Sequence, residues 1–258
     1  MSMTVNSIAK NQMDSALMKI SSMKRVNTAA DDAAGLAIME EMEKEIRGLQ
    51  KGTDNTLDMQ NLLKTAEGGL SQIDDSLQRI RELSVQASNG IYTQEDRALI
   101  QSEIKQHLDN IDSLTQNTEF NNKKLLDGSF QNQHTASSPD GSGATISIPD
   151  MSTGSTALGS IMNFDVTQDF SIDDIDNAIN GVSNTRAYLG AMMNRFDSTV
   201  ESNNITMLNQ AAAKSRIADL DIAKAMNDMN RSRLLTEAQI YNQRRQQQQM
   251  TNPVSALL

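Results

Sequence analysis

An unbroken stripe of aliphatic and small side chains between residues 59 and 87 constrains the fold more than any other feature of the sequence. Its members recur at alternating steps of four and three residues: Met59, Leu63, Ala66, Leu70, Ile73, Leu77, Ile80, Ser84 and Ala87. This spacing keeps one face of a helix against a partner helix, as in coiled coils. It predicts a helix from Met42 to about Ser88, roughly 70 Å long at about 1.5 Å per residue, which Asn89-Gly90 ends.

Similar patterns predict three further helices. Thr93 caps a helix over residues 94–116, and the short link before it makes this helix antiparallel to the first. Another helix begins at Ser171, where the steps of three and four resume. A final helix spans residues 211–249, until Pro253 stops it.

The middle of the chain has a different character. Residues 118–170 contain two of the three prolines, and polar and apolar side chains alternate over residues 144–148. Pro139-Asp140-Gly141 is a turn sequence, so one or two short hairpins are predicted. Residues 131–170 are interpreted as a short β-hairpin and loop insert. The predicted fold class is mainly α, with long antiparallel, coiled-coil-like helices formed by both chain halves and this small insert.

Charge and composition argue against several functional classes. The chain has 23 Lys and Arg against 33 Asp and Glu, a net charge of −10, and so lacks the basic face that nucleic-acid binding requires. No apolar stretch approaches the roughly 20 residues that cross a bilayer, so membrane insertion is not expected either. The absence of cysteine excludes disulfides and thiolate metal sites. The first twenty residues lack the apolar run of a cleaved secretory signal.

No catalytic, cofactor-binding or metal-binding residue is predicted. Asp31 and Asp32 are adjacent and point in different directions on a helix, so they cannot hold one centre together. His107 and His134 are the only histidines, and neither has further ligands at helical spacing. No phosphate-binding loop, Ser/His/Asp arrangement or HExxH motif occurs. Arg186 lies on an apolar stripe and therefore needs an acidic partner on a neighbouring helix.

Several long segments resemble one protein family. Residues 19–38 (KISSMKRVNTAADDAAGLAI) and 77–90 (LQRIRELSVQASNG) closely resemble the N-terminal signature of bacterial flagellins. The C-terminal half agrees, in LGAMMNRF at 189–196, SRIADLD at 215–221 and the closing SALL at 255–258. The resemblance covers about residues 17–130 and 171–258, with the segments in the same order as in the family.

The resemblance implies a division into three regions. Residues 1–40 and 211–258 would be terminal helical arms that form the inner core of a filament. Residues 41–130 and 171–210 would form a helical outer core domain. Residues 131–170 would stand in place of a large variable domain, which makes the chain similar to a minimal flagellin.

The function implied is that of a structural subunit which is secreted and polymerises into the extracellular flagellar filament for swimming motility. Two alternatives remain open: a hook–filament junction protein, which shares the terminal arms, and a soluble coiled-coil signalling or adaptor protein. The implied partners are further copies of the chain, a flagellar export chaperone, the filament cap, hook-associated proteins and, where the organism meets an animal host, a Toll-like receptor. No cofactor is implied.

The resemblance also implies two sets of site residues. The polymerisation contacts would be Ile20, Arg25, Asn27, Asp31, Asp32, Leu220, Met226, Leu234, Leu235, Leu257 and Leu258. The receptor-binding surface would comprise Gln78, Arg79, Leu83, Gln86, Glu103 and Gln106.

Some positions depart from the family pattern. Met23 stands where a glycine is usual, and His107 where an arginine is more frequent. The arm that precedes the N-terminal signature is expected to be about a dozen residues shorter than in other members. The tract at 243–249 is richer in glutamine and arginine than expected.

Overall fold

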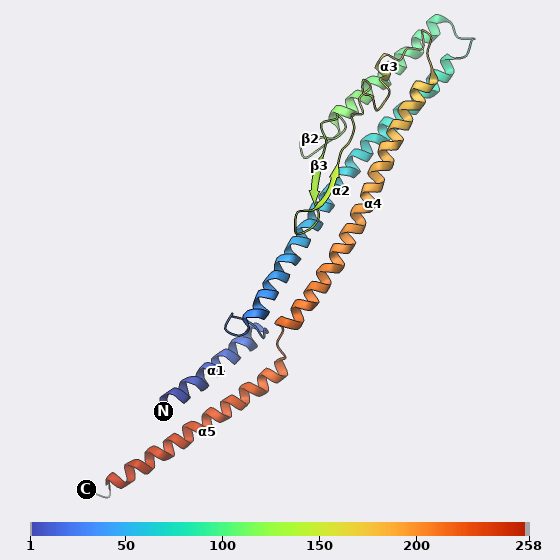
Figure 1. Cartoon of the computed structure of the whole chain (residues 1–258). Coiled ribbons are helices and arrows are strands. Elements are labelled where there is room, and N and C mark those ends of the chain that lie inside the picture. Colours follow the sequence, from blue (N-terminus) through green and yellow to red (C-terminus); the bar gives the residue numbers. More distant parts are fainter. Residues whose placement is uncertain (1, 256–258) are drawn as a thin grey trace. The chain divides into compact units, whose positions relative to one another are not determined.

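The computed structural model of the protein describes residues 2–255 (Figure 1). The helices are α1 (Ser2–Ser22), α2 (Ala33–Ala87), α3 (Gln94–Asn117), α4 (Ile172–Ala218) and α5 (Ile222–Ser255), with a short 3-10 helix η1 (Ile161–Asn163). The strands are β1 (Glu119–Phe120), β2 (Lys123–Lys124), β3 (Gln133–Ala136) and β4 (Gly143–Ile146). The chain forms two compact units: a terminal unit of Met1–Ile46 with Leu208–Leu258, and a central unit of Arg47–Met207.

The mainly α fold with small antiparallel strand pairs is confirmed. α3 agrees closely with its predicted range, and Thr93 begins it with a capping box in which Thr93 and Asp96 bond each other's backbone N–H groups. α2 begins earlier than the predicted Met42. Asp32 accounts for this, because its Oδ1 accepts a hydrogen bond from the Gly35 N–H at 2.8 Å and thereby caps the helix at Ala33.

The prediction of one final helix over residues 211–249 is wrong. α4 continues as far as Ala218, the helix breaks over residues 219–221, and α5 begins at Ile222. Asp221 starts the new helix by accepting the Lys224 N–H at 3.0 Å. α5 also extends past Pro253 to Ser255, because a proline removes only one bond in a last turn where the hydrogen-bond ladder is already ending.

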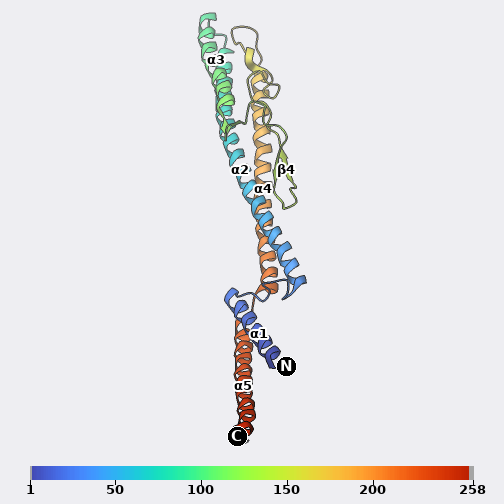
Figure 2. The ribbon, with the colours of Figure 1, turned by 90° about the vertical axis from the view of Figure 1, so that its left-hand side faces the viewer.

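The core of the central unit lies along the stripe that the sequence predicts on α2. Leu63, Ala66, Leu70, Ile73, Leu77, Ile80 and Ala87 are fully buried. α3 and α4 run beside α2 (Figures 1 and 2) and contribute Ile104, Ile111, Ile175, Val182, Leu189 and Phe196 to the same cluster. Truncating any of these large side chains to alanine would cost about 2–5 kcal/mol of stability, so the stripe holds the three helices together.

Between residues 53 and 81, one polar residue in each heptad of α2 bonds to α4. These residues, which we call the heptad polar line, follow one another at intervals of seven: Thr53, Gln60, Glu67, Asp74 and Arg81. Their partners run in the opposite direction along α4, at Asn203 (3.4 Å), Asp197 (2.7 Å), Arg186 (2.8 Å to Glu67 and 3.5 Å to Asp74) and Asp176 (2.6 Å). The acidic partners predicted for Arg186 are thereby confirmed.

The two hairpins pack onto α2. The predicted turn at Pro139-Asp140-Gly141 connects β3 to β4, which pair antiparallel with Thr135 opposite Ala144. β1 pairs with β2 in the same sense, with Glu119 opposite Lys124. A Cβ atom added at Gly52 would overlap the Ser137 carbonyl, so the absence of a side chain there lets the β3–β4 hairpin lie directly against the helix backbone.

Candidate assembly site at the arm joint

Two helix breaks meet in the terminal unit. The segment 23–32 separates α1 from α2, and it lies against the break between α4 and α5. Lys24 and Asp219 form an antiparallel bridge, with the Arg25 N–H donating to the Ala218 carbonyl (2.6 Å) and the Leu220 N–H donating to the Met23 carbonyl (3.1 Å). The two breaks thus satisfy each other's backbone groups. We call residues 23–32 with 217–221 the arm joint.

Arg25 reinforces this pairing with its side chain. Its Nε and Nη2 atoms both donate to the Ile217 carbonyl, at 3.2 and 2.9 Å. That carbonyl is one of the last in α4 and has no partner further along its own helix. A cation at a helix C-terminus is also favoured by the helix dipole. Arg25 therefore closes the end of α4.

The two adjacent acids of the joint have separate tasks. Asp31 Oδ2 accepts the N–H groups of Asn27 (3.1 Å) and Thr28 (3.0 Å), while Lys19 contacts its Oδ1 at 2.7 Å. The hydrogen bond from the Lys19 ammonium, followed by those two backbone N–H groups, holds the pKa of Asp31 well below its usual value. Asp32 instead caps α2 and lies 3.8 Å from Arg25.

A small apolar cluster lies beneath the joint. Val26, Met39 and Ala218 are buried, and Leu36 and Ile217 pack against them. Val26 is only 2% exposed. Since fully burying one such side chain is worth about 1.5–3 kcal/mol, this cluster anchors the joint segment between its polar contacts.

The arms also expose several large apolar side chains. α1 and α5 lie side by side (Figures 1 and 2) and contact each other. Large apolar side chains are nevertheless exposed, namely Leu17, Met18, Met226, Leu234, Leu235 and Tyr241. Leu234 is 66% and Leu235 56% exposed. An apolar surface of this kind marks an interaction site.

The structure divides the expected polymerisation residues into two groups. Arg25, Asn27, Asp31 and Asp32 already make bonds within the arm joint, and Ile20 and Leu220 are half-buried. Met226, Leu234 and Leu235 lie exposed on α5. Leu257 and Leu258 fall outside the described residues.

The expected receptor-binding residues share one region of the central unit, with one exception. Arg79 on α2 donates to Glu103 on α3 at 2.7 Å and to Glu82 at 3.0 Å, and this pairing raises the pKa of Arg79. Gln78, Gln86 and Gln106 are exposed. Leu83 was expected on this surface, but it is 2% exposed and belongs to the core. It cannot contact a partner directly.

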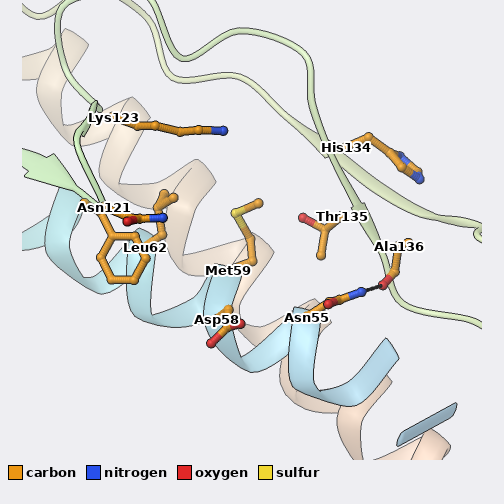
Figure 3. Close-up of a pocket in the computed structure, with 10 residues that line it drawn as sticks. Asn55, Asp58, Met59, Leu62, Asn121, Lys123, His134, Thr135 and Ala136 are labelled. Atoms are coloured by element: carbon orange, nitrogen blue, oxygen red, sulfur yellow. Dashed lines mark hydrogen bonds between the residues drawn. The ribbon is translucent and has the colours of Figure 1, made fainter. Parts of the chain in front are cut away.

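Figure 3 shows an open groove of about 430 Å³ between α2 and the two hairpins. Met59 and Leu62 form its apolar floor, and Lys123 reaches across it. The Thr135 hydroxyl is buried there and has no hydrogen-bond partner within the described part of the chain. The His134 ring turns away from the groove to contact the Gly141 carbonyl at 3.0 Å. Asp58, Asn55 and Asn121 also line the groove, which thus offers mainly apolar surface together with one ammonium, one carboxylate and two amides.

Metal binding and membrane crossing are two further possibilities for residues 2–255. No group of three or more His, Cys, Asp and Glu side chains in this range is placed to hold a metal ion. No helix in the same range combines the length and the apolarity needed to cross a bilayer.

The first testable prediction concerns Met23, which adopts a left-handed conformation with φ of 55°. This conformation costs a non-glycine residue about 1–2 kcal/mol, whereas glycine adds about 0.5–1 kcal/mol of unfolding entropy. Met23→Gly should therefore stabilise the joint by roughly 0.5–1 kcal/mol. Amide hydrogen exchange at Arg25 and Leu220 should slow by about two- to fivefold.

Ser21→Gly provides the matched control for Met23→Gly. Ser21 is exposed in the last turn of α1, where glycine adds entropy without relieving strain. Exchange at the same amides should be unchanged or faster in this variant. Slower exchange in both variants would contradict the role assigned to Met23.

A second prediction concerns Asp31 and pH. Because its folded-state pKa is lowered from 3.8, the carboxylate stabilises the joint above about pH 3.8 and loses this effect as the pH falls below it. Asp31→Asn should melt at a lower temperature than wild type at pH 7, and the difference should shrink on acidification. Circular dichroism melts across this range measure the effect. Asp14→Asn, an exposed change on α1, should show no such convergence.

Comparison with known proteins shows the family. Residues 1–131 match the bacterial flagellin N-terminal helical region, and residues 172–257 match the bacterial flagellin C-terminal helical region. The flagellin of Halalkalibacterium halodurans is 40% identical, over 88% of this chain and 85% of its own length. The flagellin of Bacillus subtilis is 38% identical, over 91% and 90%.

Two further similarities extend this finding. The flagellar filament 33 kDa core protein of Treponema phagedenis is 38% identical, over 85% of this chain and 83% of its own length. A structure described as a flagellar hook-associated protein from Vibrio parahaemolyticus shares the fold, with a TM-score of 0.57 over 73% of this chain and 100% of that chain. At 17% identity that likeness concerns the fold alone. With both terminal regions matched and relatives near 40% identity along most of its length, this chain belongs to the bacterial flagellin family.

Proposed function

We propose that this chain is a structural subunit of the extracellular bacterial flagellar filament, in which the apolar side chains exposed on its arms provide contacts between copies. Its similarity to flagellins and to a filament core protein supports the assignment to the filament. The work of such a subunit is mechanical, since flagellins are structural proteins.

The single observation that carries the assembly mechanism is the set of large apolar side chains exposed on α5. Met226, Leu234 and Leu235 are each about half or more exposed in the isolated chain. Burying apolar surface against a neighbour releases about 25 cal/mol per Å². An arm surface that contacts a different surface on the next copy makes a heterologous interface, which can continue into an open helical polymer.

The hook–filament junction alternative is less well supported. The 17% identical structure supports it at the level of the fold alone, whereas the relatives near 40% identity are flagellins. A closed adaptor oligomer would be expected to bury the α5 face within a few copies. Growth of filaments by the purified chain separates filament subunits from both alternatives.

The third testable prediction concerns two of these exposed apolar side chains on α5. Leu234→Asp with Leu235→Asp places two charges where burial is required, so polymerisation should be lost. Sedimentation and electron microscopy of the purified chain measure the outcome: wild type should pellet as filaments and the double variant should stay in the supernatant.

A matched control adds the same two charges to the same helix. Asn227 and Asn230 are exposed polar residues of α5, and Asn227→Asp with Asn230→Asp should still form filaments. Filament growth by the leucine variant would rule out Leu234 and Leu235 as assembly contacts. Circular dichroism should show the same helix content in both variants, so that loss of folding is not mistaken for loss of assembly.

The same exposed apolar side chains suggest which other proteins bind the chain before and after assembly. Leu234, Leu235 and Ile240 are exposed on α5 and would need cover inside the cell, since such patches promote aggregation. An export chaperone would provide this cover, and the filament cap and hook-associated proteins would receive the same arms at the ends of the filament. The family resemblance supports these partners.

A host Toll-like receptor is proposed to bind the surface around Arg79. The support is the resemblance of residues 77–90 to the family signature, together with an exposed Arg79–Glu103 pair that joins α2 to α3. Arginine is a frequent energetic centre of interfaces because its planar guanidinium bonds several acceptors. Leu83 is left out of this surface because it is buried.

The fourth testable prediction follows from this surface. Arg79→Ala in monomeric protein should lower receptor signalling by about tenfold in a reporter-cell assay, the loss typical of an interface arginine. Arg195→Ala, an exposed change on α4, is the control and should signal like wild type. Equal activity of the two variants would remove Arg79 from the receptor surface.

A further inference from the structure

The sequence contains the dipeptide Asn-Gly twice, in two different environments. Asn89-Gly90 lies in the turn between α2 and α3, and Asn180-Gly181 lies inside α4. We propose that Asn89 is a site of spontaneous covalent modification, at which the side-chain amide is lost and the turn gains a carboxylate, whereas Asn180 is protected. The two sites differ in backbone geometry and in the bonding of the glycine nitrogen.

The turn leaves the reacting nitrogen available. Asn89, Gly90 and Ile91 are exposed, Ile91 by 77%. The Asn89 side-chain oxygen accepts the Ile91 N–H at 3.2 Å, and the Asn89 carbonyl accepts the Tyr92 N–H at 3.2 Å. Both bonds pass over Gly90, whose own N–H has no partner among the described residues. The asparagine side chain is therefore folded back over an unbonded glycine nitrogen.

The chemistry needs only solvent. Once deprotonated, the Gly90 nitrogen attacks the Asn89 Cγ carbon and forms a new carbon–nitrogen bond. The bond from Cγ to the amide nitrogen breaks, and ammonia leaves with the proton that the Gly90 nitrogen has given up. Water then opens the resulting five-membered ring at one of its two carbonyl carbons, which yields aspartate or isoaspartate. The absence of a Cβ atom on Gly90 leaves the path of attack open.

α4 prevents the same reaction at Asn180. Gly181 lies within the helix, where its N–H donates to the carbonyl four residues earlier. A Cβ atom at Gly181 would overlap the Ala157 carbonyl, so the loop over α4 also packs closely against this point. The nitrogen becomes available only when the helix opens locally, and such opening is rare in a packed element.

The product would alter the end of α2. A carboxylate beside a helix C-terminus is repelled by the partial negative charge of the last carbonyls. Isoaspartate also lengthens the backbone by one atom, which would disturb the Asn89–Tyr92 bond and the neighbouring contact between Gln86 and the Tyr92 hydroxyl (3.1 Å). The exposed turn would thus change in charge and shape as the protein ages.

The experiment compares the two sites within one sample. Full-length folded protein is incubated in mildly alkaline buffer, digested and analysed by peptide mass spectrometry with separation of isoaspartate. Asn89 should convert at least about tenfold faster than Asn180, because opening of α4 must precede reaction there. In a parallel sample kept in urea the two rates should converge. An unmodified Asn89 in folded protein, or equal rates at both sites, would overturn the proposal.

Gly90→Ala is the matched variant. A Cβ atom at Gly90 meets nothing within 4 Å, and its φ lies outside the left-handed region, so the turn should keep its structure. The added methyl group hinders the attacking nitrogen, and conversion at Asn89 should fall by roughly tenfold or more. Unchanged conversion in this variant would show that the Gly90 nitrogen is not the nucleophile and would also overturn the proposal.

Discussion

The central unit depends on a single buried stripe along α2. The large apolar side chains that α3 and α4 contribute to the core belong to the same buried cluster as this stripe, and the two hairpins rest on the same helix. With only eight Phe, Tyr and Trp residues in 258, the protein builds this core mainly from aliphatic side chains, whose regular repeat suits helices packed along their length. The β3–β4 hairpin can approach α2 closely because Gly52 presents no side chain to it.

The terminal unit is organised differently, around hydrogen bonds rather than a long apolar seam. The arm joint has a core of only a few side chains, and its order comes from the Lys24–Asp219 bridge, the Arg25 guanidinium and the Asp31 turn. Arg25 closes the end of α4, while Asp32 and Asp221 cap the starts of α2 and α5. Large apolar side chains of α1 and α5, among them Leu17, Leu234 and Leu235, stay exposed, and under the proposal above they provide contacts with other copies.

Much of this structure could be predicted from the sequence, and the exceptions have identifiable physical causes. The α2 stripe, the Thr93 cap, the β3–β4 turn and the pairing of Arg186 follow from local patterns. The break between α4 and α5 does not, because helical periodicity continues through residues 219–221 and the break depends on bonds to residues 23–25, far away in sequence. Leu83 was assigned to the receptor surface from the family resemblance alone, and the predicted stripe passes through Ser84 instead of Leu83. Only packing shows that Leu83 and Ser84 are both buried.

The heptad polar line has a consequence for alignment. An apolar stripe that repeats every seven residues would accept its partner almost as well after a slip of one heptad. The polar line differs in chemistry at each step, so a slip in one direction would set Glu67 against Asp197, and a slip in the other would set Asp74 against Asp176. Either slip brings two carboxylates together and separates pairs that are now bonded. The heptad polar line therefore selects one alignment of α2 with α4 and disfavours the two alignments that are shifted by one heptad.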